Sequence, residues 1–172
     1  YNKNIGAGKL GVTLSGTFRE NTFEGVNLPD LNTNLTDEEL ADNYVNRGLI
    51  GQFETGTPSS KIIGTLNYSI GKFSAMLRGT RFGSVQTRDS RERTLLDGSV
   101  GYADQFFTPE FTTDIGITYN FTDNISFTIG GNNIFNEYPE IVRYELRTFN
   151  LYSNYQQGSS GSYYFGRLTF TL

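Results

Sequence analysis

Two runs of alternating apolar and polar residues, joined by a tight polar turn, occupy the stretch from Phe111 to Gly130. In the first run one parity is mostly aromatic or aliphatic, and the other is mainly threonine, glycine, aspartate and asparagine. After Thr122-Asp123-Asn124 the alternation resumes with Ile125, Phe127 and Ile129. A period of two predicts a β-hairpin with one apolar and one polar face. Each run is about ten residues long, which is enough for a tilted strand to cross a bilayer.

Four further stretches alternate in the same way and are predicted as strands. In the first of them the polar parity carries Lys9 and Arg19, which could not sit in a dry core, so this face is expected to meet water. We therefore predict roughly six strands, each with one apolar and one wet face. The four stretches are Gly8 to Arg19, Lys61 to Ile70, Phe73 to Thr80 and Ser162 to Leu172.

The connections alternate between short and long, which is the topology of outer-membrane barrels, with short turns in the periplasm and long loops outside. A soluble sandwich has no reason to separate its connections in this way. Short turns are predicted at Gly71-Lys72 and around Asp123, and Tyr1 to Ala7 is also placed as a turn. The long segments are Glu20 to Ser60, Phe82 to Pro109 and Glu140 to Gly161.

The first long segment contains a helix signal and a weak resemblance to a calcium loop. Thr36-Asp37-Glu38-Glu39 has the form of a capping box and predicts a short helix from Asp37 to about Asn46. Asp30 to Asn34 has the oxygen-ligand spacing of a calcium loop. Leu35 and Ala41 stand where such a loop needs glycine and glutamate, so a solvated acidic loop is favoured.

The amino-acid composition excludes most kinds of catalytic site. The chain has 172 residues, including 20 Gly, 11 Tyr and 14 Phe, and no Cys, His or Trp. Disulfides, thiolate sites and histidine bases are therefore excluded, and we expect no enzyme activity, no catalytic, cofactor or metal residues and no cofactor. The net charge of −4 argues against nucleic acid. The second long loop carries charges of both signs, which predicts internal pairing or solvation there.

A family resemblance rests on two blocks of sequence. The run GGNNIFNEYP (130–139) resembles the NNLFD-x-x-YP run that precedes the last strand of TonB-dependent outer-membrane receptors, and here YYFGRLTFTL (163–172) ends the chain. The block from Phe53 to Val85 is also similar to the barrel of that family. Leu172 stands where the family usually ends on phenylalanine.

The resemblance implies an antiparallel transmembrane β-barrel in the bacterial outer membrane of a Gram-negative cell. Its implied function is TonB-energised uptake of a scarce ligand such as a metal chelate, with iron carried by a ferric siderophore as the first candidate. The implied partners are the lipid bilayer, the remainder of the same barrel with its plug, periplasmic TonB through parts outside this chain, and the small-molecule ligand. The ligand-binding residues are left unassigned.

Roughly six strands are too few for a closed barrel, since the smallest have about eight. We therefore expect further strands outside residues 1–172 to complete the barrel. The family resemblance implies that residues 1–172 are the C-terminal strands of a barrel of about 22 strands, without the plug domain. For the same reason, the absence of a signal segment at Tyr1 is no argument for the cytoplasm. Two alternatives remain open. One is a complete eight-stranded barrel with a structural or adhesion role, which uses Leu95 to Tyr102 and Tyr144 to Leu151 as extra strands. The other is a soluble β-sandwich binding module.

Side-chain directions and strand partners follow from this topology. The strand from Gly8 is expected to pair with Lys61 to Ile70 on one side and with a strand outside this sequence on the other. The strand ending at Leu172 is expected to pair with Ile125 to Asn133 and with a strand supplied from elsewhere. We predict Leu14, Leu77, Ile117 and Phe127 toward lipid, and Thr13, Arg78, Thr118 and Thr128 toward the lumen.

Overall fold

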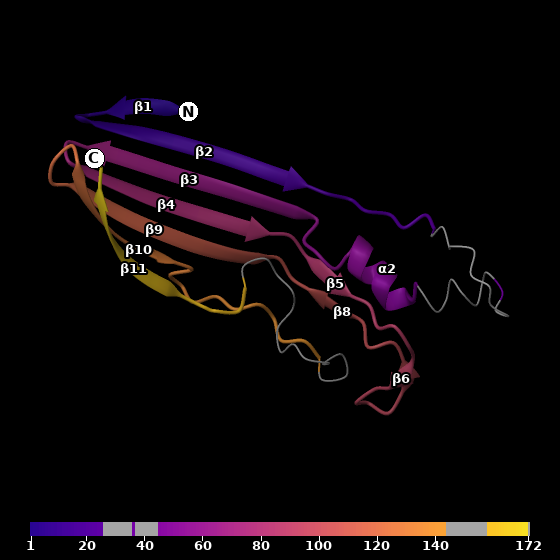
Figure 1. Ribbon diagram of the computed structural model, residues 1–172. Helices are drawn as coiled ribbons and strands as arrows, with labels where there is room; N and C mark the ends of the chain where they lie inside the picture. The colour runs from indigo at the N-terminus through magenta and orange to yellow at the C-terminus, as the bar shows by residue number, and fades with distance from the viewer. Residues whose placement is uncertain (26–35, 37–44, 144–157, 172) are drawn as a thin grey trace.

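The computed structural model describes residues 1–25, 36, 45–143 and 158–171, and its main feature is one curved antiparallel sheet (Figure 1). Seven strands lie in the order β1-β2-β3-β4-β9-β10-β11. The fold is all-β and antiparallel, as predicted, with a single short helix among the described residues. The strands are β1 (Asn2–Ile5), β2 (Gly8–Phe18), β3 (Ser60–Ile70), β4 (Phe73–Phe82), β9 (Glu110–Asn120), β10 (Ile125–Asn132) and β11 (Tyr163–Phe170).

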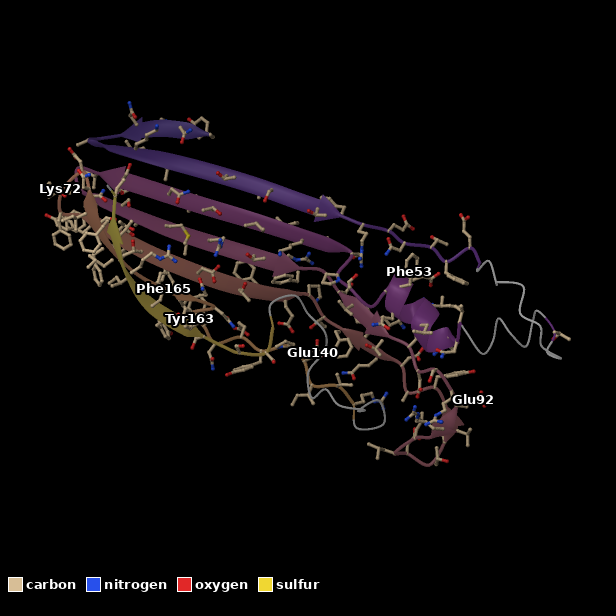
Figure 2. The ribbon with its side chains drawn as sticks, viewed as in Figure 1. Phe53, Lys72, Glu92, Glu140, Tyr163 and Phe165 are labelled. Atoms are coloured by element: carbon tan, nitrogen blue, oxygen red, sulfur yellow. The ribbon has the colours of Figure 1, made fainter. Side chains whose placement is uncertain are left out.

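The six alternating stretches all form strands, with ends within two residues of the prediction. Short turns at 6–7, 71–72 and 121–124 lie at one end of the sheet, and the three long connections leave from the other end. Figure 2 shows Lys72 at the short-turn end and Glu92 beyond the opposite end. The predicted separation of short and long connections is therefore confirmed as geometry.

The N-terminal segment corrects one prediction. Residues Tyr1 to Ala7 are not only a turn, because β1 pairs with β2 from Asn2 opposite Gly11 to Ile5 opposite Gly8. Gly6 takes a φ of 60°, a left-handed conformation that favours glycine, and it closes the hairpin. Four residues hold only two periods of alternation, too few for the sequence pattern to indicate a strand.

This strand also corrects a predicted pairing. β2 pairs with β3 over its whole length, as expected, but its other side is occupied near Gly8 to Val12 by β1 rather than by a strand outside the sequence. The predicted pairing of β11 with β10 is confirmed, from Ile125 opposite Phe170 to Asn132 opposite Tyr163. β2 and β11 do not pair with each other, so the sheet stays open across the described strands.

The two parities of the strands lie on opposite faces of the sheet. Leu14, Leu77, Ile117 and Phe127 are 76%, 45%, 48% and 40% exposed on the convex apolar face. The polar parity shares the other face, because register places Thr13 in line with Arg78 through Thr65, and pairs Thr118 with Thr128. The prediction that the apolar and polar parities lie on opposite faces of the sheet is thus confirmed. That the apolar face meets lipid and the polar face meets the lumen stays a prediction.

The helix differs from the prediction. The predicted helix from Asp37 to about Asn46 falls mostly outside the described residues, and so does the calcium-like run from Asp30 to Asn34. The observed helix α2 spans Arg47–Glu54 and begins at Asn46, whose side-chain oxygen accepts a hydrogen bond from the Leu49 amide at 3.1 Å. No helix within the described residues is both long and apolar enough to cross a membrane.

The second long loop folds into a small lobe at the long-loop end of the sheet. It contains β5 (Val85–Thr87) paired with β8 (Gln105–Phe107), and β6 (Arg93–Thr94) paired with β7 (Val100–Gly101). The alternative of an eight-stranded barrel needs Leu95 to Tyr102 in the main sheet, but β7 within it pairs only with β6. Its other strand, Tyr144 to Leu151, lies outside the described residues. The buried apolar core of the lobe and the adjoining strand end consists of Phe82, Val85, Phe107 and Val142.

Candidate functional site

The polar face of the sheet is crossed by a row of side chains that are direct register partners. Four hydroxyl side chains stand between two cations, and Thr118 and Thr128 hydrogen bond to each other at 2.8 Å. Because register partners on adjacent antiparallel strands point to the same face, all six side chains share one surface. In order across the sheet the row is Lys9, Ser69, Ser74, Thr118, Thr128 and Arg167.

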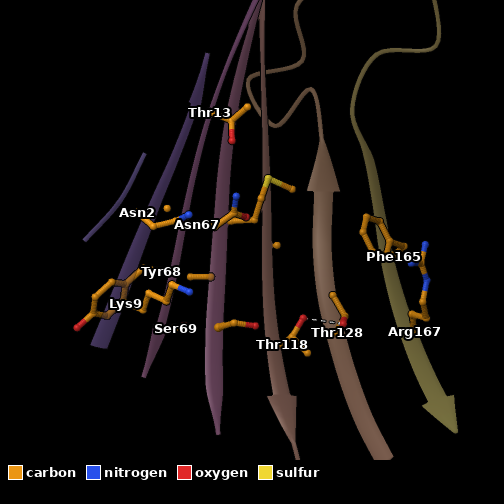
Figure 3. Close-up of a pocket in the computed structure, with 15 residues that line it drawn as sticks. Asn2, Lys9, Thr13, Asn67, Tyr68, Ser69, Thr118, Thr128, Phe165 and Arg167 are labelled. Atoms are coloured by element: carbon orange, nitrogen blue, oxygen red, sulfur yellow. Dashed lines mark hydrogen bonds between the residues drawn. The ribbon is translucent and has the colours of Figure 1, made fainter. Parts of the chain in front are cut away.

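This row borders a hollow of about 520 Å³ on the polar face. Figure 3 shows Lys9 and Arg167 on opposite sides of it. The next row toward the long-loop end has glycine at three of its six places, Gly11, Gly116 and Gly130, and larger side chains at the others, Asn67, Met76 and Phe165. The Phe165 ring lies over Gly130 and the Asn2 side chain lies beside Gly11, whereas a Cβ on Gly116 would meet only the Met76 methyl group, at 3.8 Å.

A charge pair lies on the same face, two residues beyond Met76 and Gly116 toward the long loops. Arg78 donates from Nε to Asp114 Oδ2 at 2.8 Å, and its terminal nitrogen lies 2.8 Å from the same oxygen. The other oxygen of Asp114 accepts the backbone amide of Asn133 at 2.8 Å. Asp114, only 9% exposed, therefore links β4 and β9 to the turn after β10.

The run GGNNIFNEYP forms a tight structured turn. Asn133 and Asn136 both have positive φ, 49° and 59°, which asparagine tolerates better than most residues. The Asn133 amide group donates to the Glu137 carbonyl at 2.7 Å and accepts from the Glu137 amide at 3.0 Å. Asn136 accepts from the Ser162 amide at 3.0 Å, just before β11 begins. The run that carries the family resemblance thus positions the last strand.

In the lobe, charged residues pair with one another, as the mixed charges of this loop predicted. Asp89 is 2% exposed, and it accepts from Arg93 at 2.7 Å and from the Ala103 amide at 3.3 Å. Asp104 accepts the Asp89 amide at 2.9 Å and holds Arg47 of α2 through both carboxylate oxygens. The helix and both short strand pairs of the lobe are joined in this way.

The carboxylates of this network have lowered pKa values. Burial alone would raise the pKa of Asp89, but hydrogen bonds from Arg93 and from the Arg91 and Ala103 amides outweigh it, and the pKa falls below its usual value. The hydrogen bond from Arg47 is the main reason that the pKa of Asp104 is also lowered. Both groups are therefore anionic at neutral pH.

A second attachment fixes α2 against β5. Glu54 accepts from Arg88 at 2.9 Å and from the Phe23 amide at 3.1 Å. Gly51 packs against Arg88 so closely that an added Cβ would lie 2.7 Å from the Arg88 Cβ. A smaller hollow of about 220 Å³ lies beside this contact, between the helix and β5.

Sequence reasoning placed Lys9 and Arg78 on wet faces but assigned no ligand residue, and it could not bring Lys9 and Arg167 into one row. They are 158 positions apart in the chain, and their alignment depends on the register of five successive strand pairs. The signal that could have found the row is the polar parity of each strand combined with the lengths of the short turns. Within the described ranges, no group of three or more potential metal ligands occurs.

The comparisons with known proteins support the fold. No protein-family model and no curated protein matches this chain. Among solved structures, a mutant of the ferric enterobactin receptor of Pseudomonas aeruginosa is similar, with a TM-score of 0.53 and 14% identity. The match covers 98% of this chain and 20% of the receptor chain, so this chain spans about a fifth of that protein's length. At this identity, the likeness shows shared β architecture alone.

Proposed function

We propose that this chain forms the C-terminal strands of a TonB-dependent receptor in the bacterial outer membrane. The barrel would have about 22 strands, with its plug contributed by another part of the polypeptide. Its function would be energised uptake of a scarce ligand, with a ferric siderophore as the first candidate. The observation that carries the proposal is a curved sheet with an apolar convex face, a polar concave face and all long connections at one end.

The open edges of the sheet support a larger barrel. Tyr1 and Val12 exchange backbone hydrogen bonds at 2.8 and 2.9 Å, so even-numbered residues of β2 direct their amide and carbonyl groups toward that edge. Beyond Val12, none of the described strands pairs with the edge from Leu14 to Phe18, and none pairs with the outer edge of β11. Unpaired edges in lipid are prohibitively costly, so further strands are expected on both sides.

The exposed convex face supports a membrane location over a soluble sandwich. A sandwich would cover its apolar face with a second sheet, as aligned sheet packings do. Here the two small sheets belong to the lobe, and Leu14, Phe18 and Leu168 remain 76%, 76% and 54% exposed. An apolar face of this extent needs either lipid or a partner.

A fractionation and growth experiment tests the proposal. Cells that make the complete protein with this sequence are fractionated, and the protein is expected in the outer membrane, extractable only with detergent. Deletion of its gene should abolish growth on at least one ferric siderophore as the sole iron source. Collapsing the proton gradient should stop uptake without removing surface binding. Recovery in the water-soluble fraction, or siderophore growth unchanged by deletion across a panel, would contradict it.

A further inference from the structure

The convex face of the sheet carries two charged side chains, and both are cations. Register places Lys3 beside Leu10 near the short turns, and it places Arg81 between Ile62 and Phe111 near the long loops. No aspartate or glutamate stands at the remaining convex positions of the seven strands. Arg81 is exposed, and none of the described carboxylates forms an ion pair with it. A charge on a face that meets lipid is costly, so this cation needs water or an anionic partner.

The position of Arg81 along β4 matches a membrane boundary. Phe73 begins β4 in an aromatic cluster at the short-turn end, where its ring centroid lies 4.6 Å from that of Tyr119. From position 73 to position 81 the strand advances about 27 Å, or about 20 Å along the axis of a barrel whose strands tilt by about 40°. The lipid-facing band of such barrels is about 25 Å tall. Arg81 therefore lies near the opposite boundary, and its long side chain can extend to the lipid headgroups there.

Open space between apolar side chains lies diagonally beside Arg81. Gly64 and Arg81 are diagonal neighbours on β3 and β4, so their Cα atoms are about 7–8 Å apart. A Cβ on Gly64 would meet no atom within 4 Å, whereas one on its register partner Gly79 would lie 2.7 Å from the Phe111 ring. On the other side Gly64 pairs with Leu14, which is 76% exposed. The space over Gly64 is about one strand wide, about 4.8 Å, which is comparable to the width of one hydrocarbon chain.

We propose that Arg81 binds the phosphate of a lipid in the outer leaflet, and that an acyl chain of the same lipid lies over Gly64. The inference rests on the proposed function, because this face meets lipid only in the outer membrane. The planar guanidinium group can donate two parallel hydrogen bonds to a phosphate, which supplies the missing anion. A lipid is favoured over free phosphate, since only a lipid would also cover the apolar walls formed by Leu14 and Phe111.

Native mass spectrometry of the complete protein in detergent tests the inference. The protein is freed of bound lipid and titrated with lipid A, a phosphorylated glycolipid, and with the same lipid after removal of its phosphates. Arg81→Gln should weaken binding of lipid A about tenfold, and removal of the phosphates should weaken binding to the unaltered protein by a similar factor. In Arg81→Gln the phosphates should matter little, because the cation and the phosphate act as one pair. Arg81→Lys keeps the charge without the planar group and should fall between.

Two further variants separate this site from general attraction to lipid. Gly64→Leu should weaken binding of both lipid forms equally, about fivefold, because leucine fits the open space and takes the place of the acyl chain. Lys3→Gln is the matched control and should bind as the unaltered protein does. Its diagonal neighbour Gly8 is covered by the Tyr68 ring, so no open space adjoins Lys3.

Unchanged binding of lipid A in Arg81→Gln, or an equal loss in Lys3→Gln, would overturn the inference. So would undiminished binding of both lipid forms in Gly64→Leu. Fractionation of the same cells distinguishes this from failure of the proposed function. Protein recovered outside the outer membrane would contradict the proposed function, whereas outer-membrane protein with unchanged binding in Arg81→Gln would contradict the lipid site alone.

Discussion

Asp89 is the most tightly held charged residue of the lobe. Its carboxylate receives two nitrogens of Arg93 and two backbone amides, and its own amide donates to Asp104. A buried carboxylate with this many donors stabilises a loop only while all its partners remain. Loss of one partner leaves the other buried polar groups without a hydrogen-bonding partner. The lobe is therefore expected to open as a unit.

Asp89→Asn should lower the free energy of opening of the lobe by about 3 kcal/mol, because Arg93 loses its anion in a buried place. Hydrogen exchange of the Arg91 and Ala103 amides in the complete protein measures this, and exchange within β3 should stay unchanged. Asp97→Asn is the matched control, since Asp97 accepts hydrogen bonds from the amide and hydroxyl of Ser99 at the exposed tip of the lobe. Equal acceleration in both variants would contradict the role of Asp89.

Acid should open the same lobe. The pKa values of Asp89 and Asp104 are lowered below 3.8 in the folded state. Groups of this kind contribute stability that is fully present above the unfolded value and is lost as pH falls through the folded pKa. Protection of amides 89–104, corrected for intrinsic exchange, should be constant from pH 7 to about 5 and fall below about 4, while β9 stays protected. Loss of protection already near pH 6 would contradict this.

At the scale of elements, strand prediction succeeded where alternation was long enough to see. β2, β3, β4, β9, β10 and β11 each hold four or more alternations, and period two alone identifies them. β1 was missed because four residues carry no clear period. The start of α2 at Asn46 was missed because Asn46 caps a helix with two glycines, Gly48 and Gly51, which lower its propensity. That helix is held by Arg47 and Glu54 contacts that no local pattern reveals.

Arginine substitutions on the two faces of β2 test which face of the sheet meets lipid. Leu14→Arg should cost about 2–4 kcal/mol if the convex face meets lipid near the bilayer midplane. Thr13→Arg, one residue away on the polar face, should cost much less, because its side chain would meet water. Denaturant titration of the complete protein refolded into vesicles measures both. A larger cost at Thr13 than at Leu14 would reverse the assignment of faces.

At the scale of the whole molecule, the sequence predicted an open set of strands because too few were counted for closure. The candidate site was less predictable, since Lys9 and Arg167 meet one hollow only through the register of every intervening strand. The lobe was predicted as a loop, and its order comes from contacts such as Asp104 with Arg47, which are distant in sequence. The local alternation of apolar and polar residues therefore predicts the strands, whereas the candidate site depends on the pairing of strands that are distant in sequence.

The open edges of the sheet predict how residues 1–172 behave when they are expressed alone in detergent. The edges at Leu14 to Phe18 and along β11 carry backbone groups that the described strands leave unpaired, and direct closure of β2 onto β11 would make a very narrow cylinder. That cylinder would force the inward Lys9 and Arg167 together without anions. The isolated chain should therefore associate through its edges rather than form a stable monomer.

Two measurements decide this. Light scattering should show oligomers or aggregates, and the amides of Leu14, Gly16, Leu168 and Phe170 should exchange faster than those of β4 in any monomer trapped at low concentration. In the complete protein the same four amides should be protected, because the neighbouring strands would then pair with them. A monodisperse monomer with all four amides protected would mean that β2 closes on β11, and the small complete barrel would replace the larger one.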